Sequence, residues 1–252
     1  MVWLWELCSR TKREGSHSIV GHRAGVGQFP YLALVVGDGS AICGGSLITP
    51  TAVLTAAHCT VKYEKFIIRL GGIYRNKSEH TAWSIETSWA VAHPDYNTDS
   101  YRSNNVAIVF LPQKAPMNRY IKLVTLPSPK DKDITLLGQT TMVSGWGWTF
   151  NSTKNQDILR WVEVKIVPNS LCEEHYEPKR ITSSILCATN NSSGLCHADN
   201  GGGLFLQTDR RDLQIGVASF CSSSCTDETP AAYTKLVSYI GWINRIAEIQ
   251  DE

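Results

Sequence analysis

Two short strings in the 252-residue chain carry residue types that could do acid–base chemistry. Thr55–Cys59 reads TAAHC and contains His58, whose imidazole could act as a general base. Cys196–Gly203 reads CHADNGGG and contains a carboxylate, Asp199. A hydrolytic triad needs a hydroxyl nucleophile, an imidazole base and a carboxylate that fixes the imidazole tautomer. These strings are therefore the candidate catalytic region.

Composition excludes several classes of protein. Hydrophobic residues make up 42% of the chain and charged residues 19%, as in an ordinary globular protein. Lys and Arg total 24 against 23 Asp and Glu, so the net charge of +1 creates no field that would attract nucleic acid or anionic lipid. No apolar run approaches the roughly 18 residues of a membrane span. No HExxH or Cys-x-x-Cys pattern suggests zinc, so no metal or cofactor is expected.

The eight cysteines are many for a cytosolic enzyme and favour disulfides in an oxidising compartment. The first residues do not form a competent signal peptide, because Glu6 interrupts their short apolar run. We expect a secreted, extracellular protein whose true start lies upstream, and we interpret residues 1–18 as a degenerate signal or pro-segment. The sequons at Asn76, Asn151, Asn190 and Asn191 matter only if the chain enters the secretory pathway.

Short β-like runs alternate with turn signals from residue 29 onward, which favours an all-β sandwich or barrel. Near the C-terminus, apolar residues recur at helical spacing, which predicts a helix over 238–249 with Ser238 as its cap. Pro127–Asp133 is the best internal boundary and divides the chain into halves of similar size. The predicted strands are Tyr31–Val36, Ser46–Ile48, Phe66–Leu70, Val106–Leu111, Leu136–Val143, Leu159–Val167 and Leu213–Ala218.

The order, spacing and identity of the motifs resemble the trypsin/chymotrypsin family of serine peptidases. Besides the two strings above, the resemblance rests on Gly145–Gly147 (GWG) and on Ser219–Phe220, and it covers roughly Ile19–Ile246. The family's aspartate motif would fall at Asn104–Ile108, which reads NNVAI. Ala41–Ile48 (AICGGSLI) and Pro230–Thr234 (PAAYT) look most like the arthropod collagenase, or brachyurin, branch. The resemblance implies two six-stranded antiparallel β-barrels, at about 29–126 and 134–237, within a peptidase domain over 19–252. It also implies disulfides that join Cys43 to Cys59, Cys172 to Cys187 and Cys196 to Cys225.

Two cysteines, Cys8 and Cys221, have no counterpart in this pairing. The simpler interpretation places Cys8 in a removed segment and leaves Cys221 as a thiol at the pocket mouth. A bridge between them is the alternative.

The resemblance assigns the triad to His58, Asn105 and Asn200, so two of the three positions are substituted. Asn105 stands where the family has its aspartate, and in this family that replacement is known to lower the turnover number about 10⁴-fold. Asn200 stands where the family has its serine, and an amide cannot form the acyl-enzyme. The chain is therefore predicted to be catalytically inactive.

Other family features are altered as well. The oxyanion hole would use the backbone N–H groups of Ala198 and Asn200, and Ala198 replaces a glycine. Gly203 replaces a proline. The activation ion pair would join the freed Ile19 to Asp199, but Ser18 precedes Ile19, so trypsin-like cleavage at that bond is not expected. The chain is expected either to stay zymogen-like or to be cut by a different protease.

The specificity pocket would lie at Gly194, Cys221 and Ala231. It carries no carboxylate and would take a small or medium apolar side chain, if it takes a ligand at all. Ser219 is expected to be structural, and His93, His175 and His197 are expected in surface loops.

Three functions remain open. The leading hypothesis is an inactive serine protease homologue, a monomer that binds peptides, protease inhibitors or active proteases. The alternative is an active serine endopeptidase of the chymotrypsin/collagenase type, if the sequence at residues 105 and 200 is in error. The third is a storage or degenerate protein with no binding role.

Overall fold

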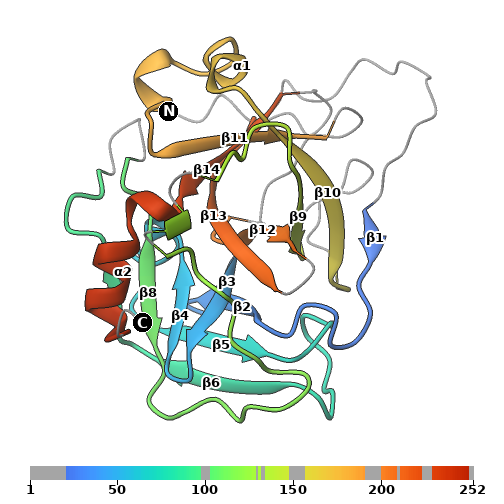
Figure 1. The fold of residues 1–252 in the computed structure, drawn as a ribbon. Coiled ribbons are helices and arrows are strands. Elements are labelled where there is room, and N and C mark those ends of the chain that lie inside the picture. Colours follow the sequence, from blue (N-terminus) through green and yellow to red (C-terminus); the bar gives the residue numbers. More distant parts are fainter. Residues whose placement is uncertain are drawn as a thin grey trace, which may run out of the picture.

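The computed structural model describes residues 21–97, 103–128, 130–131, 134–147, 157–190, 200–208, 211–222 and 229–249. They form two antiparallel sheets that lie one above the other in Figure 1, with β2 to β8 in the lower sheet and β1 and β9 to β14 in the other. None of the helices in these ranges is long and apolar enough to cross a bilayer.

The first sheet contains seven strands in the order β6-β5-β2-β3-β4-β8-β7. Its edge strands β6 and β7 are separated only by residues 88–89. The two edge strands of the curled sheet are therefore consecutive parts of one bent segment. If β6 and β7 are counted as one strand, the sheet curls into a barrel of six strands. The strands are β2 (Leu32–Gly37), β3 (Ala41–Thr49), β4 (Ala52–Thr55), β5 (Phe66–Leu70), β6 (Trp83–Thr87), β7 (Ala90–Ala92) and β8 (Ala107–Phe110).

The second sheet closes on itself. Its order is β1-β10-β11-β14-β13-β12-β9, and an additional ladder between β9 and β10 completes a ring of six strands with β1 outside it. The predicted fold of two antiparallel barrels is thus confirmed. The strands are β1 (His22–Arg23), β9 (Thr140–Gly145), β10 (Arg160–Val167), β11 (Ile185–Thr189), β12 (Gly203–Gln207), β13 (Asp212–Phe220) and β14 (Ala231–Lys235).

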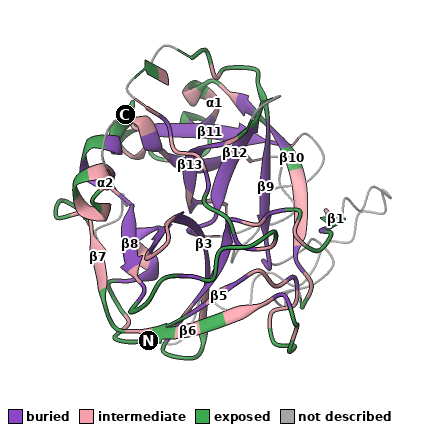
Figure 2. Ribbon diagram, turned by 60° about the horizontal axis from the view of Figure 1, so that its bottom comes forward, coloured by how far each residue is buried: buried purple, intermediate pink, exposed green. Residues whose placement is uncertain are grey.

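The larger apolar core fills the first barrel and extends to Met142, Phe205 and Val217 of the second, and most of the second barrel's remaining core forms a separate cluster; Figure 2 shows the inner strands as buried. Phe66, Leu34 and Leu47 are among the largest fully buried residues of the first barrel, and Leu204 and Tyr233 of the second. The β-like runs between turn signals predicted seven of the fourteen described strands, and β5 has the predicted bounds. The strand predicted over 136–143 is β9 and begins only at Thr140, because Gln139 closes a turn with Leu136.

The barrels contact each other through a polar and an aromatic interaction. The Tyr31 hydroxyl, just before β2, donates to Asp212 Oδ2 in β13 at 3.1 Å, and its ring lies 4.7 Å from that of Phe205. Burial, followed by the Asp212 carboxylate, raises the pKa of Tyr31 above its ordinary value. The hydroxyl therefore remains a donor at physiological pH.

The C-terminal helix α2 (Ile240–Ala247) packs on β8 of the first barrel, beside which it lies in Figure 1. The helix was predicted, but its start and its cap were wrong. Residues Leu236–Ser238 form the 3₁₀ turn η4, and Tyr239 occupies the cap position without a side-chain hydrogen bond. Trp242 and Ile243 anchor the helix in the first core, so its stability comes from packing rather than from capping. The other short helices are η1 (Ala57–Cys59), α1 (Asn169–Glu173) and η3 (Pro178–Arg180).

Candidate active site

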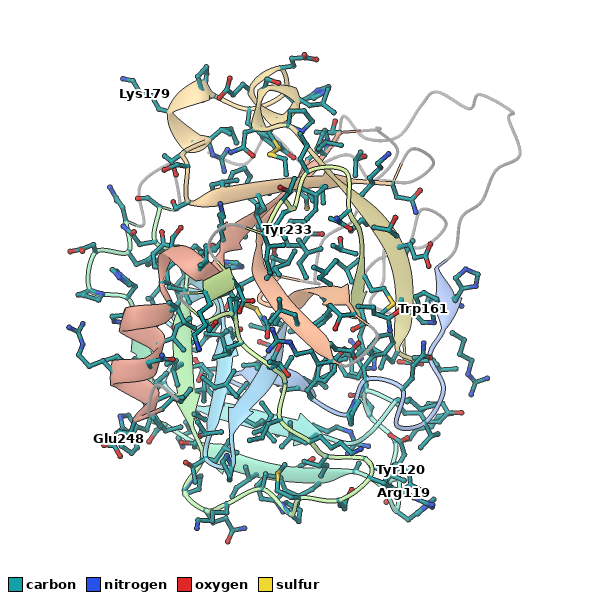
Figure 3. All side chains as sticks on the ribbon, viewed as in Figure 1. Arg119, Tyr120, Trp161, Lys179, Tyr233 and Glu248 are labelled. Atoms are coloured by element: carbon teal, nitrogen blue, oxygen red, sulfur yellow. A yellow bond between two sulfur atoms is a disulfide. The ribbon has the colours of Figure 1, made fainter. Side chains whose placement is uncertain are left out.

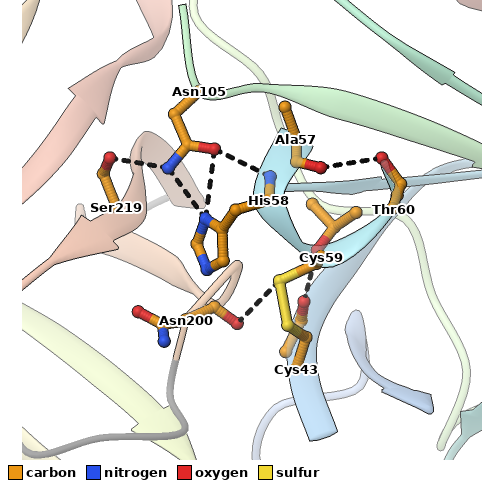
Figure 4. Close-up of a disulfide and its surroundings, with 10 residues drawn as sticks. Cys43, Ala57, His58, Cys59, Thr60, Asn105, Asn200 and Ser219 are labelled. Carbon is orange, nitrogen blue, oxygen red and sulfur yellow. Dashed lines mark hydrogen bonds between the residues drawn. A yellow bond between two sulfur atoms is a disulfide. The ribbon is translucent and has the colours of Figure 1, made fainter. Parts of the chain in front are cut away.

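His58 lies in the single turn η1, which follows β4 of the first barrel. The disulfide between Cys43 and Cys59 fixes this turn to β3, as Figure 4 shows. The predicted pairings Cys43–Cys59 and Cys172–Cys187 are both confirmed. Because Cys59 is adjacent to His58, the bridge limits how far the imidazole can move.

Asn105 immediately precedes β8 and is fully buried. Its Oδ1 accepts a hydrogen bond from the backbone N–H of His58 at 3.1 Å, and its Nδ2 donates to Ser219 Oγ at 2.7 Å. The Thr234 hydroxyl donates to its backbone carbonyl at 3.1 Å. The Asn105 side chain thus links η1 of the first barrel to β13 of the second.

The Asn105 amide also faces the imidazole ring of His58. Both Asn105 atoms lie close to His58 Nδ1, with Oδ1 at 3.1 Å and Nδ2 at 2.9 Å. The backbone N–H of His58 can only donate, so it requires the oxygen where Oδ1 is placed. Nδ1 can then either donate to Oδ1 or accept the second Nδ2 hydrogen, depending on the tautomer of the ring. In the tautomer that accepts at Nδ1, the ring carries its proton on Nε2, which can then donate but cannot accept a hydrogen bond.

Asn200 lies on the side of the imidazole away from Asn105 (Figure 4). Its carbonyl accepts from the backbone N–H of Gly44 at 2.8 Å, which ties it to β3. The next residue, Gly201, has φ +79°, and a Cβ there would overlap Thr55 Oγ1. A Cβ on Gly44 would lie 2.8 Å from the Cα of Gly202. The two barrels therefore meet backbone to backbone at this point, which explains why glycines occupy both sides.

A small cavity opens beside Asn200. It is lined by Ser219, Phe220, Cys221 and Ala231 among other residues of the second barrel. About 20 Å³ is available to the centre of a water molecule, which is room for one or two waters rather than for a side chain. Two of the predicted pocket residues, Cys221 and Ala231, thus line one cavity together with Asn200.

Several predicted site residues lie outside the described part of the chain. They are Cys8, Ser18, Ile19, Asn151, Asn191, Gly194, Cys196, His197, Ala198, Asp199 and Cys225.

The remaining predicted histidines and sequons differ in exposure. His175 and Asn76 are exposed. His93, expected in a surface loop, is half-buried, with its ring 5.1 Å from that of Trp242 and 5.4 Å from that of Tyr239. Asn190 is also half-buried, and its Nδ2 donates to the Glu163 carbonyl at 2.9 Å.

A group of metal-ligating residue types also occurs at the site. One atom each of Cys43, His58 and Cys59 lie within 4.8 Å of one another. Both sulfurs belong to the disulfide, so neither is a thiolate that could bind a metal.

Comparison with known proteins identifies the family, because the Trypsin family model matches residues 18–243. The chain belongs to the trypsin family. It is 33% identical to the chymotrypsin of Phaedon cochleariae over 224 residues, which covers 86% of this chain and 76% of that protein. It is 30% identical to kallikrein-8 of Mus musculus over 256 residues, which covers 100% of this chain and 94% of that protein. A solved structure of HL collagenase superposes with a TM-score of 0.82 at 28% identity and covers 92% of this chain and 100% of that one.

Proposed function

We propose that this member of the trypsin family is non-catalytic and acts by binding. The observation that supports this most strongly is Asn200, which the family pattern aligns with the nucleophilic serine and which lies beside His58. A carboxamide nitrogen is conjugated with its carbonyl and cannot attack a peptide bond or leave an acyl-enzyme. Loss of the nucleophile alone is sufficient for inactivity, so the other substitutions need not multiply the effect.

The hydrogen bonds of Asn105 support the same conclusion independently. We propose that Nδ2 donates to His58 Nδ1, which places the imidazole proton on Nε2, the atom that would have to accept one from a nucleophile. Asn105 also carries no charge to stabilise an imidazolium. A thiol or hydroxyl placed near His58 by other means would therefore still lack an effective base.

The retained scaffold is what we expect of a binding protein. The turn that carries His58, the bridge to Cys43 and the contact of Gly44 with Asn200 all persist without the chemistry they would serve. We propose that the cleft engages peptides, protein inhibitors of serine proteases or active proteases, and that the protein is a secreted monomer. Its disulfides favour an oxidising compartment. Residues Ile19 and Asp199 would form the activation pair, and Gly194 would complete the pocket with Cys221 and Ala231.

A paired assay tests the proposal. The purified protein, cut before Ile19, is incubated with a diverse peptide mixture, and cleavage is followed by mass spectrometry. Binding of protein inhibitors of serine proteases is measured in parallel by calorimetry. We expect no cleavage and measurable binding.

Two variants locate the binding surface. Cys221→Arg adds bulk beside the cavity and should abolish inhibitor binding. Ile67→Arg changes an exposed residue of the first barrel and should leave it unchanged. Cleavage by the unmodified protein would support the alternative of an active endopeptidase, and equal binding by both variants would argue against the cleft as the binding surface.

A further inference from the structure

Next to the cavity, one arginine is held in place by aromatic rings rather than by an acidic partner. The guanidinium carbon of Arg180 lies 4.2 Å from the centroid of the Phe220 ring and 5.9 Å from that of Tyr176. Among the described residues, no hydrogen bond or ion pair engages its side chain, and its Nε is buried without a partner. The side chain as a whole is only partly buried, so the outer edge of the fork faces solvent.

The surface beneath this arginine is rigid. Phe220 is 6% exposed and packs in a small core that includes the bridged Cys172 and Cys187. The Tyr176 ring meets Phe220 edge-on at 5.1 Å, and its hydroxyl donates to the Pro230 carbonyl at 2.7 Å. The aromatic support of Arg180 is therefore fixed before any ligand arrives, which lowers the entropy lost on binding.

The same residues border the candidate site. Phe220 and Cys221 line the cavity beside Asn200, so the Phe220 ring is shared between the cavity and the stack with Arg180. Tyr176 is close to Cys221 as well. Burial first, and then Cys221, raise the pKa of Tyr176, while Arg180 and the Ser222 amide oppose this.

We propose that Arg180 is a carboxylate-binding residue that recognises an acidic side chain of a polypeptide bound beside the cavity. A guanidinium that stacks on a ring keeps its N–H edge free, and that edge matches a planar carboxylate in a bidentate arrangement. The single positive charge of the guanidinium is matched by the single negative charge of one carboxylate. This inference rests on the proposed function, because it assigns a partner chemistry to the same cleft.

The test observes Arg180 directly by NMR, through the Nε–Hε resonance of its side chain. The probes are N-acetylglutamate amide and its uncharged isostere N-acetylglutamine amide, titrated into the full chain. N-acetylalanine and its amide form a second pair that separates a side-chain carboxylate from a C-terminal one. We expect the glutamate probe to shift the Arg180 resonance and the glutamine probe to leave it unchanged.

Three variants give the matched comparison. Arg180→Met should weaken binding of the glutamate probe about tenfold, as expected for loss of a charge-assisted pair. Arg180→Lys keeps the charge but loses the planar fork, so it should weaken binding less. Lys179→Met is the control, because Lys179 is the exposed neighbour in η3 and extends away from the molecule in Figure 3. Thermal unfolding of each variant checks that the fold is intact.

Several results would overturn the inference. They are no shift with the glutamate probe, equal shifts with the glutamine probe, or an equal loss in Lys179→Met. Each would leave the proposed function standing, because cleavage and inhibitor binding are measured separately. Conversely, cleavage by the unmodified protein would end the non-catalytic proposal, and the NMR titration would still report separately whether Arg180 binds a carboxylate.

Discussion

The two sides of the site differ in how their polar groups are satisfied. On the first-barrel side, both polar atoms of the Asn105 amide have partners, including the His58 backbone and Ser219. On the second-barrel side, a small cavity adjoins Arg180, whose side chain has no described hydrogen-bond partner. An amide fits the first environment as well as a carboxylate would, since its oxygen accepts the same backbone N–H. The preserved hydrogen bonds around Asn105 therefore do not distinguish an active site from an inactive one. The guanidinium of Arg180, which has no described acidic partner, does indicate a ligand.

The two disulfides allow the stability of the two sides to be compared directly. Their sequence separations are 16 for Cys43–Cys59 and 15 for Cys172–Cys187, so the chain-entropy contribution should be nearly equal, at about 3 kcal/mol each. Replacing either pair by alanines should lower the free energy of unfolding by a similar amount, measured by denaturant titration. Losses that differ by several kcal/mol would show that packing around the bridges, rather than loop closure, sets their value.

The backbone contact between the barrels can be broken at one glycine. Gly201→Ala forces a side chain into a left-handed conformation and against Thr55, so it should cost about 2–4 kcal/mol of unfolding free energy. Gly138→Ala is the control, because Gly138 has φ +81° but nothing within 4 Å of a Cβ, and it should cost about 1–2 kcal/mol. If both variants lost the same stability, the close approach at Gly201 would contribute nothing.

The hydrogen bond between Asn105 and Ser219 can be tested against a buried serine that lacks such a bond. Ser219→Ala leaves an Asn105 N–H without its acceptor, and the expected loss is about 1–2 kcal/mol. Ser46 is equally buried, but its hydroxyl has no partner, so Ser46→Ala should be nearly neutral. Thermal unfolding of the two variants measures the difference. A larger loss in Ser46→Ala would contradict the assignment.

The smallest expected effect concerns His93 and pH. The pKa of His93 is lowered, mainly because its ring is partly buried against Trp242 and Tyr239. The charge of Asp95 raises this pKa, and the charge of Arg245 lowers it further. The folded state therefore favours the neutral ring. The stability that this contributes is fully present above about pH 6.5, the pKa of His93 in the unfolded chain, and it is lost as the pH falls through the lower pKa of the folded state.

A comparison of variants isolates this effect. His93→Gln should flatten the decline in melting temperature below about pH 6.5. His175→Gln, at an exposed position, should leave the profile unchanged. Identical profiles for the two variants would rule out the assigned role of His93.

Local patterns predicted what depends on local interactions. The β-like runs between turn signals predicted β5 and six of the other thirteen described strands, and helical spacing predicted α2. Sequence could not predict that β6 and β7 are one bent segment, because strand pairing depends on contacts far apart in the chain. It also misplaced the helix start, where η4 and the burial of Trp242 outweigh the capping preference of Ser238.

The site was predictable only through the family pattern. Nothing in the spacing of His58, Asn105 and Asn200 brings them together without the two-barrel fold. Arg180 was missed because its stacking on Phe220 joins η3 to the end of β13, residues 40 positions apart that no local motif connects. An arginine next to an aromatic residue in sequence would have given a signal, but this contact is tertiary.

The most direct test of the central claim is labelling by a fluorophosphonate directed at serine nucleophiles. The chain, cut before Ile19, is treated with excess reagent beside an active trypsin-family protease, and intact masses are measured. We predict that the active protease gains one label per molecule and that this chain gains none, with no burst of product from an ester substrate. Stoichiometric labelling of this chain would contradict the account, because it would require a working nucleophile that Asn200 cannot supply.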